Sequence, residues 1–261
     1  MIESKEKLLE EKRKIEEWEN DQKDVFFWEK IGRVPFMILD KLTPKFIHEK
    51  INNVVDEIAI YVENGGQYIL NQDSILKKAS AHLDKDGLTL EEIQNIPLQD
   101  MDRISGQFLE QRKKTAKIQG ATTGIGGLFT LAIDVPLVLG MSLKTLQETA
   151  ICYGYDASSQ EERLFMIKCM QFTSSDIVGK KAILEELTNP NNDKSISQIQ
   201  GWREVLITYT DQFGWKKLFQ MIPVAGMIFG AYMNKQAIAD IGEVGSMLYK
   251  KRRINERLAD L

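Results

Sequence analysis

One carboxylate lies alone in an otherwise uncharged stretch of the chain. Asp134 is the single charged residue of segment 118–143, which is rich in apolar residues and glycine. Apolar surroundings raise the pKa of a carboxyl group, and a raised pKa suits proton transfer near neutral pH. A hydrolase-like reaction would need Thr123 and Asp156 brought to Asp134 by the fold. The alternative is structural, because an Asp two residues before Pro136 is a typical helix start.

The residue types that bind metals are few and scattered. The chain has two histidines and two cysteines, and none of them forms a CxxC, an HExxH or another zinc-type spacing. We therefore expect no metal site and no cofactor. Cys152 lies in an apolar stretch, which is typical of a buried structural thiol. Free thiols fit a reducing compartment.

A calcium loop is excluded by spacing around Gly87. With Gly87 as the sixth loop position, the twelfth is Ile93, where an EF-hand needs a bidentate Glu. The same residues predict a turn at Gly87. Thr89 and Glu92 then have the spacing of a capping box that opens the next helix.

The glycines of segment 118–143 do not make a phosphate loop. Leu128 follows Gly126-Gly127 where a P-loop needs Lys, and Phe129 occupies the place of the third glycine of a dinucleotide fingerprint. Gly120 and Gly124, like Gly226 and Gly230, are instead four residues apart. That spacing predicts one bare helix face in each segment and the close approach of another backbone.

The sequence around these residues has a helical pattern. Apolar residues recur at helical spacing along most of the chain, and strand signals are sparse. We predict an all-α fold, a multi-helix single domain around a Gly-rich apolar helical hairpin. Residues 1–24 are predicted to form a charged N-terminal helix and residues 25–261 the main domain, with a loop at 188–201. Asn64-Gly65-Gly66 predicts a helix stop or a kink.

Composition narrows the function classes. Apolar residues make up 43% of the chain, charged residues 28%, and the net charge is −4. These values are typical of a globular protein and exclude a strongly basic nucleic-acid binder. Residues 3–24 lack the apolar segment of a signal peptide, so we expect a cytoplasmic location.

Segment 118–143 raises the question of membrane contact. As a helix it would be about 39 Å long at ~1.5 Å per residue, against a hydrocarbon core of ~30 Å. Asp134 opposes insertion by roughly 2.5–3.5 kcal/mol, and Pro136 also disfavours a span. Three interpretations stay open: a buried hairpin, conditional membrane contact and a permanent span.

Five motifs in order resemble the EcsC family over about residues 25–258. They are Thr123-Gly124-x-x-Gly127, Asp134-x-Pro136, Tyr153-Gly154-Tyr155-Asp156, the segment with Pro223, Gly226, Gly230 and Asn234, and Tyr249-x-x-Arg252.

The EcsC family is named after a bacterial protein encoded beside an ABC transporter, and the resemblance implies no established activity or cofactor. It implies a non-enzymatic accessory or adaptor protein at the cytoplasmic face of the membrane, near a transporter. The expected partner is a membrane lipid or a membrane protein. Basic clusters at Arg112–Lys117, Lys216–Lys217 and Lys250–Arg253 would contact it, or would be solvated helix ends. A carrier of an apolar ligand between the Gly-rich helices is the alternative.

Overall fold

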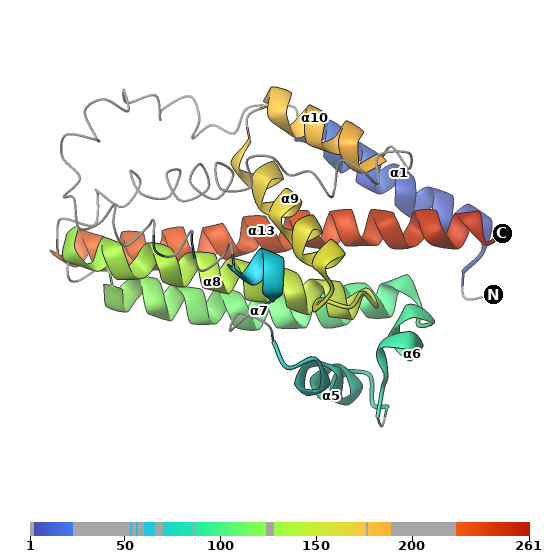
Figure 1. Ribbon diagram of the computed structural model, residues 1–261, viewed down its shortest axis with the longest axis horizontal. Helices are drawn as coiled ribbons and strands as arrows, with labels where there is room; N and C mark the ends of the chain where they lie inside the picture. Colours follow the sequence, from blue (N-terminus) through green and yellow to red (C-terminus); the bar gives the residue numbers. More distant parts are fainter. Residues whose placement is uncertain are drawn as a thin grey trace.

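Three long helices form the frame of the molecule (Figure 1). The computed structural model describes residues 3–22, 53, 56, 60–65, 70–85, 87–123, 128–175, 177–188 and 223–261. The frame consists of α7 (Leu98–Thr123), α8 (Leu128–Cys152) and α13 (Pro223–Ala259). α7 packs along α13, and α8 packs against both. The three helices are therefore in mutual contact, and the core lies between them.

The core follows the helical period of the sequence. Met101, Ile104 and Phe108 of α7 are spaced by three or four residues and are fully buried, as are Ile238 and Ile241 of α13. Each helix thus turns one apolar stripe inward. Every regular element among the described residues is a helix, which confirms the all-α prediction.

The N-terminal helix lies along the C-terminal part of α13. α1 (Lys5–Asp21) begins at an N-cap, Ser4, whose side chain accepts a hydrogen bond from the N–H of Lys7. Its outer face is highly charged, and only Leu8 and Ile15 are fully buried. Trp18 adds a hydrogen bond from Nε1 to Glu243 of α13 at 2.7 Å.

Two short helices precede α7 and cover one side of the frame. They are α5 (Gln72–His82) and α6 (Leu90–Gln94), and both contact α8. The predicted capping box is present: the Thr89 side chain accepts from the N–H of Glu92, and Glu92 accepts from the N–H of Thr89. Gly87 adopts a φ of +67° in the preceding turn.

α9 (Gln160–Ser174) packs against α8 and α13, and it contacts α10 (Ile177–Thr188). Almost every side chain of the central turns of α9 is buried, so this helix belongs to the interior. Residues 60–64 are helical and end at Gly65, which has a φ of +87° and confirms the predicted stop. Arg163 of α9 donates to the carbonyl oxygens of Val62 and Glu63 at that helix end.

Segment 118–143 is divided between two helices. Its first residues end α7 and its later ones begin α8, and these two helices pack against each other. No helix among the described ranges is long and apolar enough to cross a membrane. Of the predicted loop at 188–201, residues 189–201 lie outside the described residues, as does the basic pair Lys216–Lys217. Thr188, the first residue of the predicted loop, instead ends α10.

Candidate functional site

The turn that follows α8 is held by two helices distant in sequence. Gly154 adopts a φ of +81°, which favours glycine. The Arg253 guanidinium of α13 donates to the carbonyl oxygen of Tyr153 from Nε at 3.0 Å and from Nη2 at 2.7 Å. Nε2 of Gln94, in α6, donates to the carbonyl oxygen of Gly154 at 2.8 Å. Two motifs separated by about a hundred residues therefore meet at this turn.

The neighbouring arginine joins α13 to α9. Nη1 of Arg252 donates to Oε1 of Glu162 at 2.6 Å. The same guanidinium carbon lies 4.3 Å from the ring centroid of Tyr155 and 5.4 Å from that of Phe165. Contacts of a guanidinium with aromatic faces are favourable, more so when the group is shielded from water. Arg252 thus has both an ion-pair partner and aromatic neighbours within the fold.

Glu162 is the most unusual carboxyl group of this cluster. Only 4% of the residue is exposed, and burial raises its pKa while the Arg252 charge opposes that rise. Its second oxygen, Oε2, has no hydrogen-bond partner in the described part of the chain, nor do the hydroxyl groups of Tyr155 and Tyr249. Any proton transfer at this position would depend on the Glu162 carboxyl group alone. Its evident role is to tie α9 to α13.

A third ion-pair group lies one turn from these arginines and connects α13 to α1 and α7. Nζ of Lys250 is 2.5 Å from Glu11 of α1 and 2.8 Å from Asp102 of α7. Asp102 also accepts a hydrogen bond from the Tyr153 hydroxyl at 2.7 Å. Burial lowers the pKa of Lys250, but hydrogen bonds to Asp102 and Glu11 outweigh it and the pKa is raised. The ammonium form is therefore the one that the fold stabilises.

The C-terminal basic cluster is accordingly not a free basic surface. Lys250 and Arg252 are paired as described, Lys251 lies 2.6 Å from Glu19, and Arg253 lies 2.8 Å from Glu256. The sequence predicts that this cluster contacts lipid or is solvated. Its side chains instead bind carboxylates on α1, α7, α9 and α13 and carbonyl groups in the turn after α8. Helical periodicity alone could not show this, because the partners lie on four separate segments.

The three candidate catalytic residues are not brought together. α8 extends from Leu128 to Cys152, so Asp134 lies in its early turns and Asp156 just beyond its other end. At ~1.5 Å per residue, the helix between them is about 27 Å long. Thr123 ends α7, where its hydroxyl donates to the carbonyl oxygen of Gln119 at 3.0 Å. Asp156 is exposed and accepts from the N–H of Ser158 at 2.9 Å.

The N-cap interpretation of Asp134 is wrong. The helix begins at Leu128, so Asp134 and Pro136 both lie inside it. Proline is tolerated in the first turn of a helix, but more than two turns of α8 precede Pro136. Pro223, by contrast, is the first residue of α13, the position where proline is favoured. Gly124 and Gly127 lie outside the described residues, as do the side chains at 134, 136, 223 and 226.

The glycine spacing correctly predicts a close helix crossing. A Cβ atom added at Gly120 of α7 would lie 2.5 Å from the carbonyl carbon of Gly230 and 2.9 Å from the nitrogen of Ala231, both in α13. The two backbones are therefore in direct contact. No apolar ligand fits between α7 and α13 at this point, which weighs against the carrier hypothesis. Asn234 is buried one turn further along α13.

The end of the frame around this crossing exposes apolar side chains. Eight large hydrophobic residues are exposed among the described ones. Five of them lie near the last turns of α7 or the first turns of α8 and α13, and we call these the apolar end: Ile118, Leu137, Met227, Ile228 and Tyr232. Figure 1 shows these three helix ends together, opposite the C-terminus. Exposed apolar groups that gather in this way are typical of interaction surfaces.

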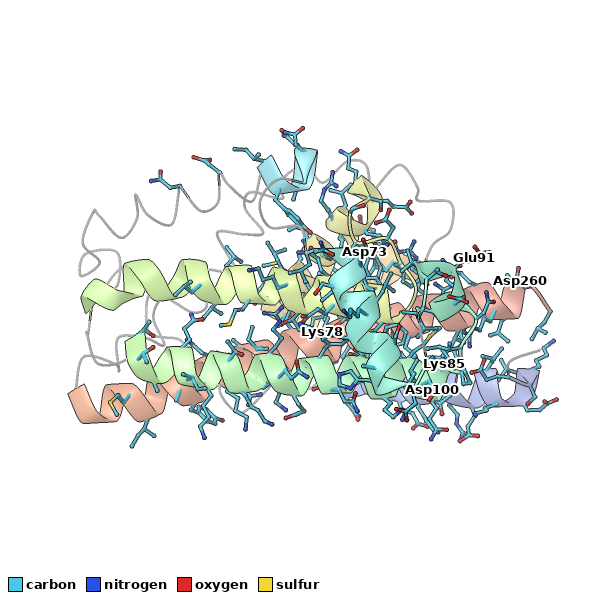
Figure 2. All side chains as sticks on the ribbon, turned by 90° about the horizontal axis from the view of Figure 1, so that it is seen from below. Asp73, Lys78, Lys85, Glu91, Asp100 and Asp260 are labelled. Carbon is cyan, nitrogen blue, oxygen red and sulfur yellow. The ribbon has the colours of Figure 1, made fainter. Side chains whose placement is uncertain are left out.

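A shallow groove near α6 is a weaker candidate for a binding site than the apolar end. It is open to solvent and lined mainly by charged and polar residues: Lys85, Leu88, Glu91, Glu92, Asn95 and Ile96. Two of these residues, Lys85 and Glu91, are labelled in Figure 2. In the described ranges no three His, Cys, Asp or Glu side chains come together as metal ligands would. Cys152 and Cys169 are buried, and burial raises the pKa of both thiols, so neither is a reactive nucleophile.

Comparison with known proteins agrees with the resemblance to the EcsC family. A family model described as the EcsC protein family matches residues 10–254. The chain is 51% identical to "Uncharacterized protein YdbA" of Bacillus subtilis (strain 168), over 99% of this chain and 97% of that protein. It is 27% identical to "Protein EcsC" of the same organism, over 62% of this chain and 67% of that protein. No solved structure matches the chain.

Proposed function

Because the chain belongs to the EcsC protein family, we propose that it is a non-enzymatic accessory or adaptor protein that acts at the cytoplasmic face of the membrane, near a transporter. The observation that carries this proposal is that polar motif residues and exposed apolar residues lie in different parts of the frame. The polar motif residues, with Arg252 and Arg253 at their centre, join helices to one another. The apolar end, by contrast, leaves large side chains in contact with solvent.

Such a division favours a binding function over a chemical one. Enzymes bring acidic, basic or nucleophilic groups together at a site that a substrate can reach. Here Asp134 and Asp156 lie toward opposite ends of α8, and Thr123 hydrogen-bonds within α7. The exposed apolar side chains of the apolar end, by contrast, are not buried in the core and are open to a binding partner. The Asp134 hydrolase and the ligand carrier have no comparable support.

Cell fractionation tests the location. Lysates are separated at low salt, at high salt and in alkaline carbonate, and the chain is quantified in each membrane pellet. We expect a membrane share at low salt that high salt releases, since ions screen the attraction of the lysines to an anionic surface. Absence from the membrane pellet at low salt would contradict the proposal. Retention through both high salt and carbonate would contradict it as well, because it would show a permanent span.

The non-enzymatic role is tested by Asp134→Asn, Asp156→Asn and Thr123→Ala. Each substitution removes a candidate chemical group, and the two Asp→Asn changes also keep the approximate shape of the side chain. We expect the membrane share and the thermal stability of all three variants to match the parent chain. A variant that loses the cellular role while keeping both properties would indicate chemistry at that residue.

A further inference from the structure

The charges around the apolar end differ in sign from those of the whole chain. The net charge of the chain is −4. The helix segments 113–123, 128–144 and 223–239 carry five lysines against one acidic residue, Asp134: Lys113, Lys114, Lys117, Lys144 and Lys235. Lys114, Lys117 and Lys235 are exposed. Glu110, which pairs with Lys113, marks the boundary of this basic region.

We propose that the apolar end docks on an anionic lipid surface, with its lysines at the phosphate level and its apolar side chains in the interface. This inference rests on the proposed membrane location and names the partner. Juxtaposed lysines attract anionic lipids, at about 1 kcal/mol each near the surface. The acidic remainder of the chain is repelled by the same surface. The charge asymmetry therefore orients the molecule with this end toward the bilayer.

The side chains at this end suit a shallow interfacial contact. Ile228 and Tyr232 are one helical turn apart and 70% and 50% exposed, so they extend from one face of α13. Gly230 and Asn234 lie on the opposite, buried face. A tyrosine has an apolar ring and a polar hydroxyl group, a combination that favours the membrane–water interface. Ile118 of α7, 66% exposed, adds a second helix to the same end.

Vesicle binding tests the inference with the purified full chain. The probes are vesicles of phosphatidylglycerol with phosphatidylcholine, and vesicles of phosphatidylcholine alone, in a sedimentation assay. We expect binding to the anionic vesicles at least about tenfold tighter, and weaker with added salt. Equal affinity for both vesicles, or no binding to either, overturns the inference.

Charge reversal provides a matched pair of variants. Lys114→Glu/Lys117→Glu/Lys235→Glu should weaken binding to anionic vesicles on the order of 100-fold, from three contacts of about fivefold each. Lys77→Glu/Lys78→Glu/Lys85→Glu changes the net charge equally but lies at α5 and the turn after it, where Lys78 and Lys85 are visible in Figure 2. We expect that control to bind within a few-fold of the parent chain. An equal loss in both variants would show attraction by net charge alone and would overturn the proposal.

Insertion of the apolar side chains has its own readout. Both native cysteines are fully buried, so an environment-sensitive dye labels an introduced thiol selectively. A dye at Ile228→Cys should shift to the blue when anionic vesicles are added, and one at Leu9→Cys on α1 should not. A shift at both positions, or at neither, contradicts docking by this end.

The outcomes separate this inference from the proposed function. A chain that ignores vesicles but has a salt-sensitive membrane share in cells binds a membrane protein, and the lipid inference is wrong. If the chain binds anionic vesicles through the apolar end but never pellets with cell membranes, the inference that this end binds lipid stands. In that case the proposed location is wrong.

Discussion

Gly120 of α7 lies directly against the backbone of Gly230 in α13. A Cβ atom at Gly120 would overlap the carbonyl group of Gly230, with the carbonyl carbon only 2.5 Å away. Neighbours at this distance are backbone atoms and cannot rotate aside as a side chain could. The crossing of the two longest frame helices therefore depends on a missing methyl group.

Substitution of Gly120 by Ala should lower the free energy of unfolding by about 1–3 kcal/mol or more, because the frame helices must separate. Gly106→Ala is the matched control in the same helix, where an added Cβ meets nothing within 4 Å. There we expect a gain of about 0.5–1 kcal/mol from helix propensity. Thermal and urea unfolding measure both changes. Equal effects at the two positions would show that the crossing is not close.

Arg252→Met should destabilise the fold by about 3–5 kcal/mol, since it leaves the Glu162 carboxylate buried without its counter-ion. Adding Glu162→Gln removes the unpaired charge and should restore part of that loss. Urea unfolding of both single variants and the double variant gives the coupling energy. Simple additivity of the two single effects would contradict the ion pair.

Gly154→Ala should destabilise more than Gly87→Ala. Both glycines have positive φ, of +81° and +67°, so each substitution imposes about 1–2 kcal/mol of backbone strain. At Gly154 the added Cβ would also lie 2.5 Å from Cγ of Gln94, whereas at Gly87 it meets nothing within 4 Å. The expected extra loss reflects the displacement of Gln94 from its hydrogen bond. A larger effect at Gly87, measured by thermal unfolding, would argue against the described turn.

Docking of α1 should depend on pH at both extremes. Burial raises the pKa of Glu11, but hydrogen bonds to Lys14 and Lys250 outweigh it and lower the pKa below the ordinary 4.5. Its contribution is thus present above about pH 4.5 and is lost as pH falls through the lowered value. The pKa of Lys250 is raised above 10.5, so its contribution is present below that pH and is lost as pH rises further.

Amide hydrogen exchange in α1, followed from pH 7 toward pH 3, measures this dependence after correction for intrinsic exchange. We expect protection to fall on acidification, and to fall less steeply in Glu11→Gln, where this ion pair is already absent. Glu10→Gln is the control, because Glu10 pairs only with Lys14 of the same helix among its described contacts. Identical pH profiles in all three proteins would contradict the role of Glu11.

The sequence predicts local structure well where a few neighbouring residues decide it. The capping box at Thr89 and Glu92 and the helix stop at Gly65 depend on residues within one turn, and both are confirmed. The close helix crossing also follows from spacing, since Gly120 and Gly230 have no side chain to separate two backbones. All of these use information within a single segment.

Long-range ion pairing is what the sequence leaves open. Ser159 and Glu162 have the spacing of a helix start, yet the Glu162 carboxylate binds Arg252 of another helix. Lys250–Arg253 has the appearance of a solvated basic helix end, and its partners lie on α1, α7, α9 and α13 itself. The prediction that Asp134 is an N-cap is wrong for a related reason. The chain is helical on both sides of Asp134, so the spacing of Asp134 and Pro136 matches a helix start although no helix begins there.

The contact between α1 and α13 has a consequence for synthesis of the chain. Arg257 pairs with Glu3 across a sequence separation of 254 residues, and its guanidinium also caps carbonyl groups at Gln94 and Ile96. At roughly 5–20 residues per second, a ribosome needs on the order of ten to fifty seconds between these two residues. During that interval α1 lacks the α13 side chains that pair with it, Lys250 and Lys251. The packing of α1 on α13 is therefore completed only after almost all of the intervening chain has been synthesised.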